Sequence, residues 1–104
     1  MQIYTVDYIP NRKYKVLGIV RGNIVQSKNV LNDIGAGLKT IVGGEISAYT
    51  DMLSTARDNA TDRMVAHAAE LGANGVIGVK YSTGNIMQNT AEVLVYGTAV
   101  IFED

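Results

Sequence analysis

The 104-residue chain predicts an α+β fold, a small sheet packed on helices, and two observations carry that prediction. Residues 43–75 repeat apolar side chains at helical spacing, whereas residues 14–26, 75–83 and 91–102 are rich in valine and isoleucine. With a short helix predicted over residues 30–42, the order along the chain is strand, short helix, long helix, strand, strand. We therefore expect three to four mostly antiparallel strands packed on one long and one short helix.

The long helix is predicted between the glycine pair Gly43-Gly44 and Gly75. Apolar residues recur there at steps of three and four, as on one face of a helix, namely at Ile46, Tyr49, Leu53, Ala56, Ala60, Met64, Ala68 and Leu71. Much of this stripe is alanine, so a neighbouring element can approach closely. Asn74-Gly75 supplies residues that tolerate the left-handed backbone that ends helices.

The remaining elements are predicted from turn residues and β-branched runs. A short strand is expected within residues 2–8, and a short helix over residues 30–42. The strand at 14–26 contains Gly18 and Gly22, where we expect bends or bulges.

The last two strands are close enough in sequence to form an antiparallel hairpin, turned at Gly84-Asn85 or Gln88-Asn89. The final strand is apolar on both sides, with Val93, Val95, Ala99 and Ile101 facing one way and Leu94, Tyr96, Val100 and Phe102 the other. One helix covers only one face of a small sheet. We therefore expect neighbouring copies to cover the remainder in a homo-oligomer.

Composition restricts the class of protein. A chain of 104 residues with 47% hydrophobic and 18% charged residues predicts one globular domain over residues 1–104. No apolar run approaches the roughly 20 residues of a membrane span, and a net charge of −1 argues against a nucleic-acid partner. The start of the chain does not resemble a secretory signal and cysteine is absent, so we expect a cytoplasmic protein.

Two groups of residues are candidates for a site. Arg57 lies within the apolar stripe and needs a partner, for which we nominate Glu92, within a chain or between chains. With Tyr49 these residues would form a ligand-binding groove between subunits. The alternative is a metal-binding site, in which His67, Glu70 and carboxylates of several subunits would bind a metal ion whose identity the sequence does not specify.

Catalysis is the less favoured interpretation. The single histidine has no serine elbow to accompany it, and Glu45, which could form an acid–base pair with His67, is several helical turns away. The segment 34–40 has leucine where a phosphate-binding loop needs glycine before lysine.

The assembled segments resemble the YbjQ-like family of small bacterial and archaeal proteins, which carry the label of a heavy-metal-binding domain. Four blocks carry the resemblance: GIVRGNIVQSKN, GGEISAYTDMLSTARDNATDRM, LGANGVIGVKY and EVLVYGTAV, at residues 18–29, 43–64, 71–81 and 92–100. The resemblance implies an α+β fold whose members assemble as rings, with pentamers expected. The positions that match the family's blocks are read first as framework and interface: Glu45, Tyr49, Arg57, Glu92, Tyr96 and Gly97.

The sequence thus predicts a homo-oligomeric binding or structural module whose partner is further copies of the same chain. Any small ligand is expected between subunits. The absence of cysteine removes the soft ligands that heavy metals prefer.

Overall fold

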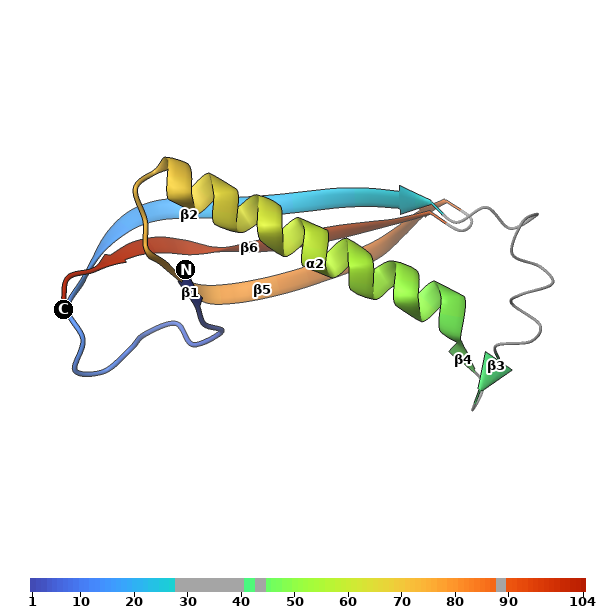
Figure 1. Ribbon diagram of the computed structural model, residues 1–104, viewed down its shortest axis with the longest axis horizontal. Coiled ribbons are helices and arrows are strands. Elements are labelled where there is room, and N and C mark those ends of the chain that lie inside the picture. The colour runs from blue at the N-terminus through green and yellow to red at the C-terminus, as the bar shows by residue number, and fades with distance from the viewer. Residues whose placement is uncertain (28–40, 43–44, 88–89) are drawn as a thin grey trace.

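The computed structural model describes residues 1–27, 41–42, 45–87 and 90–104 (Figure 1). The predicted α+β class is confirmed, with a four-stranded sheet and one helix in this part of the chain. The elements in chain order are β1 (Gln2–Ile3), β2 (Tyr14–Ser27), β3 (Ile41–Val42), β4 (Glu45–Ile46), α2 (Ser47–Glu70), β5 (Gly75–Met87) and β6 (Thr90–Phe102).

The main sheet has the order β1-β5-β6-β2 and is mixed. The pairs β5–β6 and β6–β2 are antiparallel, whereas β1 runs parallel to β5. The predicted hairpin is confirmed, but Gly84 and Asn85 are not its turn, because they continue β5 and pair with Glu92 and Ala91. The alternative turn, at residues 88–89, lies outside the described residues.

The long helix is confirmed, although it begins at Ser47 and not at Gly43. Ile46, predicted to continue the helical stripe, lies in β4, which pairs with β3 in a separate two-stranded sheet. Residues 30–40 of the predicted short helix lie outside the described residues. Its last two positions form β3, so the prediction is wrong there.

The helix ends at a glycine other than the one expected. Gly72 has a φ of 86°, which favours a residue without a Cβ. The N–H of Gly72 donates to the carbonyl of Ala69 at 3.0 Å and that of Ala73 to Ala68 at 3.0 Å. These two bonds form a Schellman motif, so Gly72, and not Asn74-Gly75, supplies the left-handed residue.

The main core lies between α2 and one face of the sheet (Figure 1). Alanines at 56, 60 and 68 and Met64 are buried on the helix, as the stripe predicted, whereas Leu71 is exposed. Gly22 of β2 allows the closest approach, because a Cβ there would overlap the carbonyl oxygen of Ala60. The sheet contributes Val20, Val76, Val79, Val93, Val95 and Ala99.

A smaller core lies on the other face, at the end of the sheet where β2 begins. Its buried residues are Ile77, Val100 and Phe102, and Ile9 and Tyr14 pack against them. As predicted, the helix covers only one face of the sheet. The N-terminal segment covers part of the other face.

The described residues leave the rest of that face uncovered. We call it the open face and define it by Ile19, Arg21, Val25, Glu92 and Tyr96, which share one side of β2 and β6 because Arg21 pairs with Tyr96 and Val25 with Glu92. Ile19 is 76% exposed, Val25 57% and Tyr96 42%. Apolar side chains on a sheet face are thus left in contact with solvent in the single subunit.

The irregularities of β2 were half predicted. The register shifts between Val16 and Gly18, and Gly18 has a φ of 136°, so the bulge expected there is confirmed. At Gly22 the pairing is unbroken, and the absence of a side chain is used for packing against α2. No helix among the described residues is long and apolar enough to cross a membrane.

Candidate functional site

A row of polar side chains joins α2 to the outer half of β5. The Tyr49 hydroxyl donates to Asn85 Oδ1 at 3.1 Å, and the hydroxyls of Thr61 and Tyr81 lie 2.8 Å apart. Both contacts run from α2 to β5. We call this row the α2–β5 strip and define it by Tyr49, Arg57, Thr61, Tyr81 and Asn85.

Arg57 belongs to the strip because residues four apart lie on the same side of a helix. It precedes Thr61 by one turn, and the Thr61 hydroxyl donates to its carbonyl oxygen at 2.7 Å. The Arg57 side chain is half-buried, and among the described residues it has no ion pair and no side-chain hydrogen bond. The strip therefore presents a guanidinium between two hydroxyl-bearing contacts.

The predicted partner of Arg57 is on the other side of the sheet. Glu92 is exposed between the buried residues Ala91 and Val93 and pairs with Val25 on the open face. Within one subunit the structure thus brings Tyr49 and Arg57 to one side and leaves Glu92 on the other. Of the two forms predicted for the Arg57–Glu92 ion pair, the one between subunits stays a prediction.

His67 has a definite role in the structure. The backbone N–H of Arg21 in β2 donates to His67 Nδ1 at 3.3 Å. The other nominated ligand, Glu70, is exposed at the end of α2. In the described part of the chain no three histidine, cysteine or acidic side chains are grouped closely enough to hold a metal ion.

The hydrogen bond to His67 restricts metal binding. A neutral imidazole has one unprotonated nitrogen, which is the one that accepts hydrogen bonds or binds a metal. Because Nδ1 accepts from the amide, the proton lies on Nε2. A metal on Nε2 would move the proton to Nδ1, and a metal on Nδ1 would displace the amide, so either mode breaks the bond.

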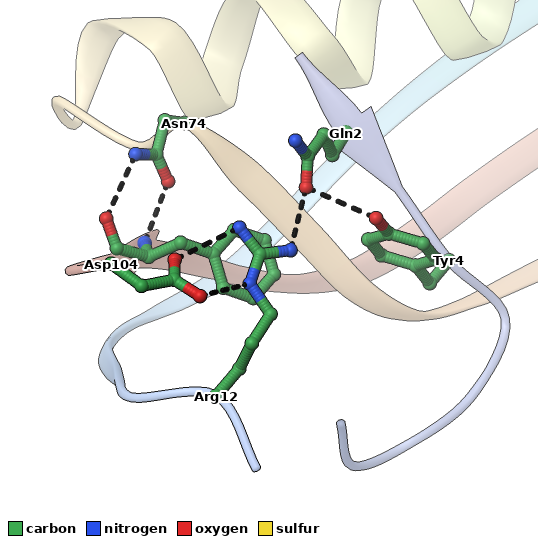
Figure 2. A network of polar contacts seen from close by, with 6 residues as sticks. Gln2, Tyr4, Arg12, Asn74 and Asp104 are labelled. Atoms are coloured by element: carbon green, nitrogen blue, oxygen red, sulfur yellow. Dashed lines mark hydrogen bonds and ion pairs between the residues drawn. The ribbon is translucent and has the colours of Figure 1, made fainter. Parts of the chain in front are cut away.

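A polar network at the far end of the sheet was not predicted (Figure 2). Arg12 donates through Nε and Nη2 to the two carboxylate oxygens of Asp104, at 2.8 and 3.0 Å, and through Nη1 to Gln2 Oε1 at 2.7 Å. Its guanidinium lies 3.8 Å from the centre of the Phe102 ring. The network therefore uses one face and the edges of the Arg12 guanidinium to hold Gln2, Phe102 and Asp104 together.

Asn74 completes this end of the molecule. Its side-chain oxygen accepts the N–H of Phe102 at 2.7 Å, and its amide donates to the Phe102 carbonyl at 3.1 Å (Figure 2). These bonds tie the connection after α2 to the end of β6. The sequence analysis singled out Asn74, but as a residue that ends the helix and not as a partner of β6.

The charges of the network act on each other. The hydrogen bond from Arg12 lowers the pKa of the Asp104 carboxyl below its ordinary value, and Asp104 in turn raises the pKa of Arg12. All three nitrogens of the Arg12 guanidinium donate to groups of the protein itself. The network is therefore a structural contact between chain ends, and the α2–β5 strip is the better candidate for binding a ligand.

Comparison with known proteins extends over the whole chain. The family model described as "Putative heavy-metal-binding" matches residues 1–103. A UPF0145 protein of Helicobacter hepaticus is 61% identical over 100 residues, covering 96% of each chain, and one of Thermotoga petrophila is 49% identical over 104 residues, covering 99% of this chain and 98% of the other.

A solved structure shows the same fold. It is a crystal structure of a protein of unknown function, assigned to the DUF74 family, from Pediococcus pentosaceus. The TM-score is 0.74 at 22% sequence identity, and the match covers 99% of this chain and 98% of that one. This similarity supports the fold alone.

The metal in the family's description does not fit the residues present. Heavy metals prefer thiolate and imidazole ligands, but the chain has no cysteine and one histidine. The Nδ1 of that histidine is engaged by a backbone amide. We therefore assign no metal to the site.

Proposed function

The chain belongs to this family of small proteins, the YbjQ-like or UPF0145 family, and from its geometry we propose that it is a homo-oligomeric binding module of the cytoplasm. In the proposed assembly the open face of one subunit packs against the α2–β5 strip of the next. Such a head-to-tail contact closes into a ring when the rotation between neighbouring subunits divides a full turn, and five subunits is the number that the family resemblance implies.

The observation that carries the proposal is the position of Arg57. A half-buried guanidinium without a carboxylate partner among the described residues favours an anionic group, which it can bind through two parallel hydrogen bonds. Along α2 it lies between Tyr49 and Thr61, whose hydroxyls contact Asn85 and Tyr81 of β5. We propose a small ligand with a carboxylate or phosphate group as the occupant.

The head-to-tail contact accounts for the third predicted site residue. Glu92 lies on the open face with Tyr96, so it would approach the strip of the next subunit and not that of its own, and there it and the anionic group of the ligand would be alternative partners of Arg57. The exposed Ile19, Val25 and Tyr96 would be buried by the same contact. Burial of such side chains contributes about 25 cal/mol per Å² of apolar surface.

Binding is tested by thermal unfolding with acetate, citrate and inorganic phosphate added singly. A ligand at 100 times its dissociation constant raises the free energy of unfolding by about 2.7 kcal/mol. We expect such a stabilisation in the native protein and its loss in Arg57→Gln, which keeps a polar side chain but no charge. Equal stabilisation of both proteins, or of neither, contradicts an anion site at Arg57.

Assembly is tested by sedimentation at micromolar concentration. We expect a closed oligomer of native chains, and a lower mass for Ile19→Lys because a charge on the open face opposes its burial. The matched control is Asn59→Lys, which adds the same charge on an exposed part of α2. A stable monomer of the native protein, or the same mass for all three, is the result that overturns the ring.

A further inference from the structure

The free edge of β2 is occupied by side chains of α2. Among the described strands β2 is the last of the sheet, so residues along it carry backbone groups with no neighbouring strand in that part of the chain. The N–H of Arg21 donates to His67 Nδ1 at 3.3 Å, and the carbonyl of Asn23 accepts from Arg63 Nη1 at 3.0 Å. The two contacts involve one donor and one acceptor of the same edge.

The placement of these contacts follows from the spacing on both elements. Arg21 and Asn23 are two residues apart, so their backbone groups point to the same edge. Arg63 and His67 are one helical turn apart, so they lie on the same side of α2. Between them Gly22 brings helix and strand together, since its backbone lies against Ala60 and Met64.

The same edge is complementary to itself. If a second copy of β2 lay antiparallel to the first with Gly22 opposite Gly22, Ile19 would lie opposite Val25 and Val20 opposite Ile24. Apolar residues would then pair with apolar ones, and Arg21 would lie opposite Asn23 and not opposite another arginine. Strand edges with such a register pair readily when they are uncovered.

We propose that Arg63 and His67 cap the edge of β2 against pairing with β2 of a second copy, and that the cap opens when His67 is protonated. An imidazolium has no acceptor nitrogen, so it cannot accept the Arg21 amide. This contact is additional to the ring and does not depend on the ring being correct. The interaction surface is the backbone of residues 19–25, and the partner is the same strand.

The surroundings of His67 include charges of both signs. Arg63 and Glu70 lie one turn before and after it on α2, and Arg21 belongs to the strand packed against it, with its side chain on the open face. A fall from about pH 8 to about pH 5 spans the range in which histidines ordinarily titrate.

The test compares sedimentation of three proteins at these two pH values. The native chain is expected to double its mass at acidic pH relative to its own mass at pH 8. His67→Gln retains an amide oxygen that can accept the Arg21 N–H without titrating, so its mass should stay constant. The double variant Arg63→Ala with His67→Ala should have the doubled mass at both pH values, and alanine preserves the helix.

The register is tested separately by cross-linking. The chain has no cysteine, so introduced cysteines are the only ones that can cross-link. When Ile19→Cys and Val25→Cys are both added to the Arg63→Ala, His67→Ala variant, oxidation should join the chains covalently in pairs. Asn59→Cys in the same variant should not be cross-linked. Unchanged mass of the native chain at acidic pH, doubling of His67→Gln to the same extent, or equal cross-linking of both cysteine variants would overturn the proposal.

Discussion

Gly22 illustrates how one missing side chain determines a contact between two elements. Its backbone lies so close to α2 that a Cβ would meet the Ala60 carbonyl and the Met64 amide, both parts of the helix backbone. A helix backbone cannot move aside as the end of a flexible side chain can. Gly84, also in a strand, has nothing within 4 Å of the corresponding position.

We expect Gly22→Ala to destabilise the protein by about 1–3 kcal/mol or more, the usual cost of forcing extra volume into a packed core. Gly84→Ala is the matched control, and it should be neutral or stabilising by up to about 1 kcal/mol because glycine is unfavourable in strands. Chemical denaturation of both variants measures the difference. Equal stability of the two would contradict the close packing at Gly22.

The sequence analysis identified several important residues but not always their roles. Gly18 was predicted as a bulge because glycine in a strand commonly marks one, and it is one. The role of Gly22 depends on where α2 lies, which no local pattern states. Arg12 and Asp104 are 92 positions apart, so their contact left no signal in either neighbourhood.

At the scale of elements, α2 stabilises the sheet through a narrow buried side. Met64 is fully buried among small residues, and Ala60 and Ala68 lie one turn on either side of it. It therefore supplies most of the volume at the centre of the contact. Met87, at the end of β5, is 64% exposed.

Met64→Ala is expected to lower the free energy of unfolding by about 2–5 kcal/mol, the range for truncating a buried methionine. Met87→Ala removes the same atoms from an exposed position and should change stability by about 0.5 kcal/mol or less. Urea denaturation of the two variants provides the comparison. A small effect of Met64→Ala would mean that the core between α2 and β2 is less well packed than described.

The existence of the long elements was predictable, and their ends were less so. Helical periodicity identified α2, and runs of valine and isoleucine identified β2, β5 and β6, because each element is long enough to show its pattern clearly. The start of α2 was placed four residues early because Ile46 fits the helical spacing but pairs in β4. The short strand expected within residues 2–8 is Gln2–Ile3. The backbone of Tyr4 and Val6 still bonds to residues of β5, and only the following residues lead to Ile9, which packs against the smaller core.

At the scale of the whole molecule, the Arg12 network joins the start of the chain to its end. Gln2, Arg12 and Asp104 come from three separate segments and meet in one network (Figure 2), and the Arg12 guanidinium lies over the Phe102 ring. The segment before β2 is thereby held over the second core. The two faces of the sheet are thus covered by different means, one by a helix and the other in part by a segment fixed at its ends.

The contribution of this network to stability should depend on pH. Because the pKa of Asp104 is lowered in the folded state, its contribution is complete above the ordinary carboxyl pKa and is lost as the pH falls through the lowered value. The native protein should therefore have a higher denaturation midpoint than Asp104→Asn at neutral pH, and the two midpoints should converge in acid. A difference that is independent of pH would exclude the ion pair as its cause.

The hydrogen bond between Arg21 and His67 also has a spectroscopic consequence. The chain has one histidine, so a nitrogen NMR spectrum of its imidazole contains a single pair of signals that need no assignment by mutation. An acceptor Nδ1 and a protonated Nε2 give well separated shifts, whereas an imidazolium gives two similar ones. The state of the β2 edge is therefore readable in solution from one side chain, in the unmodified protein.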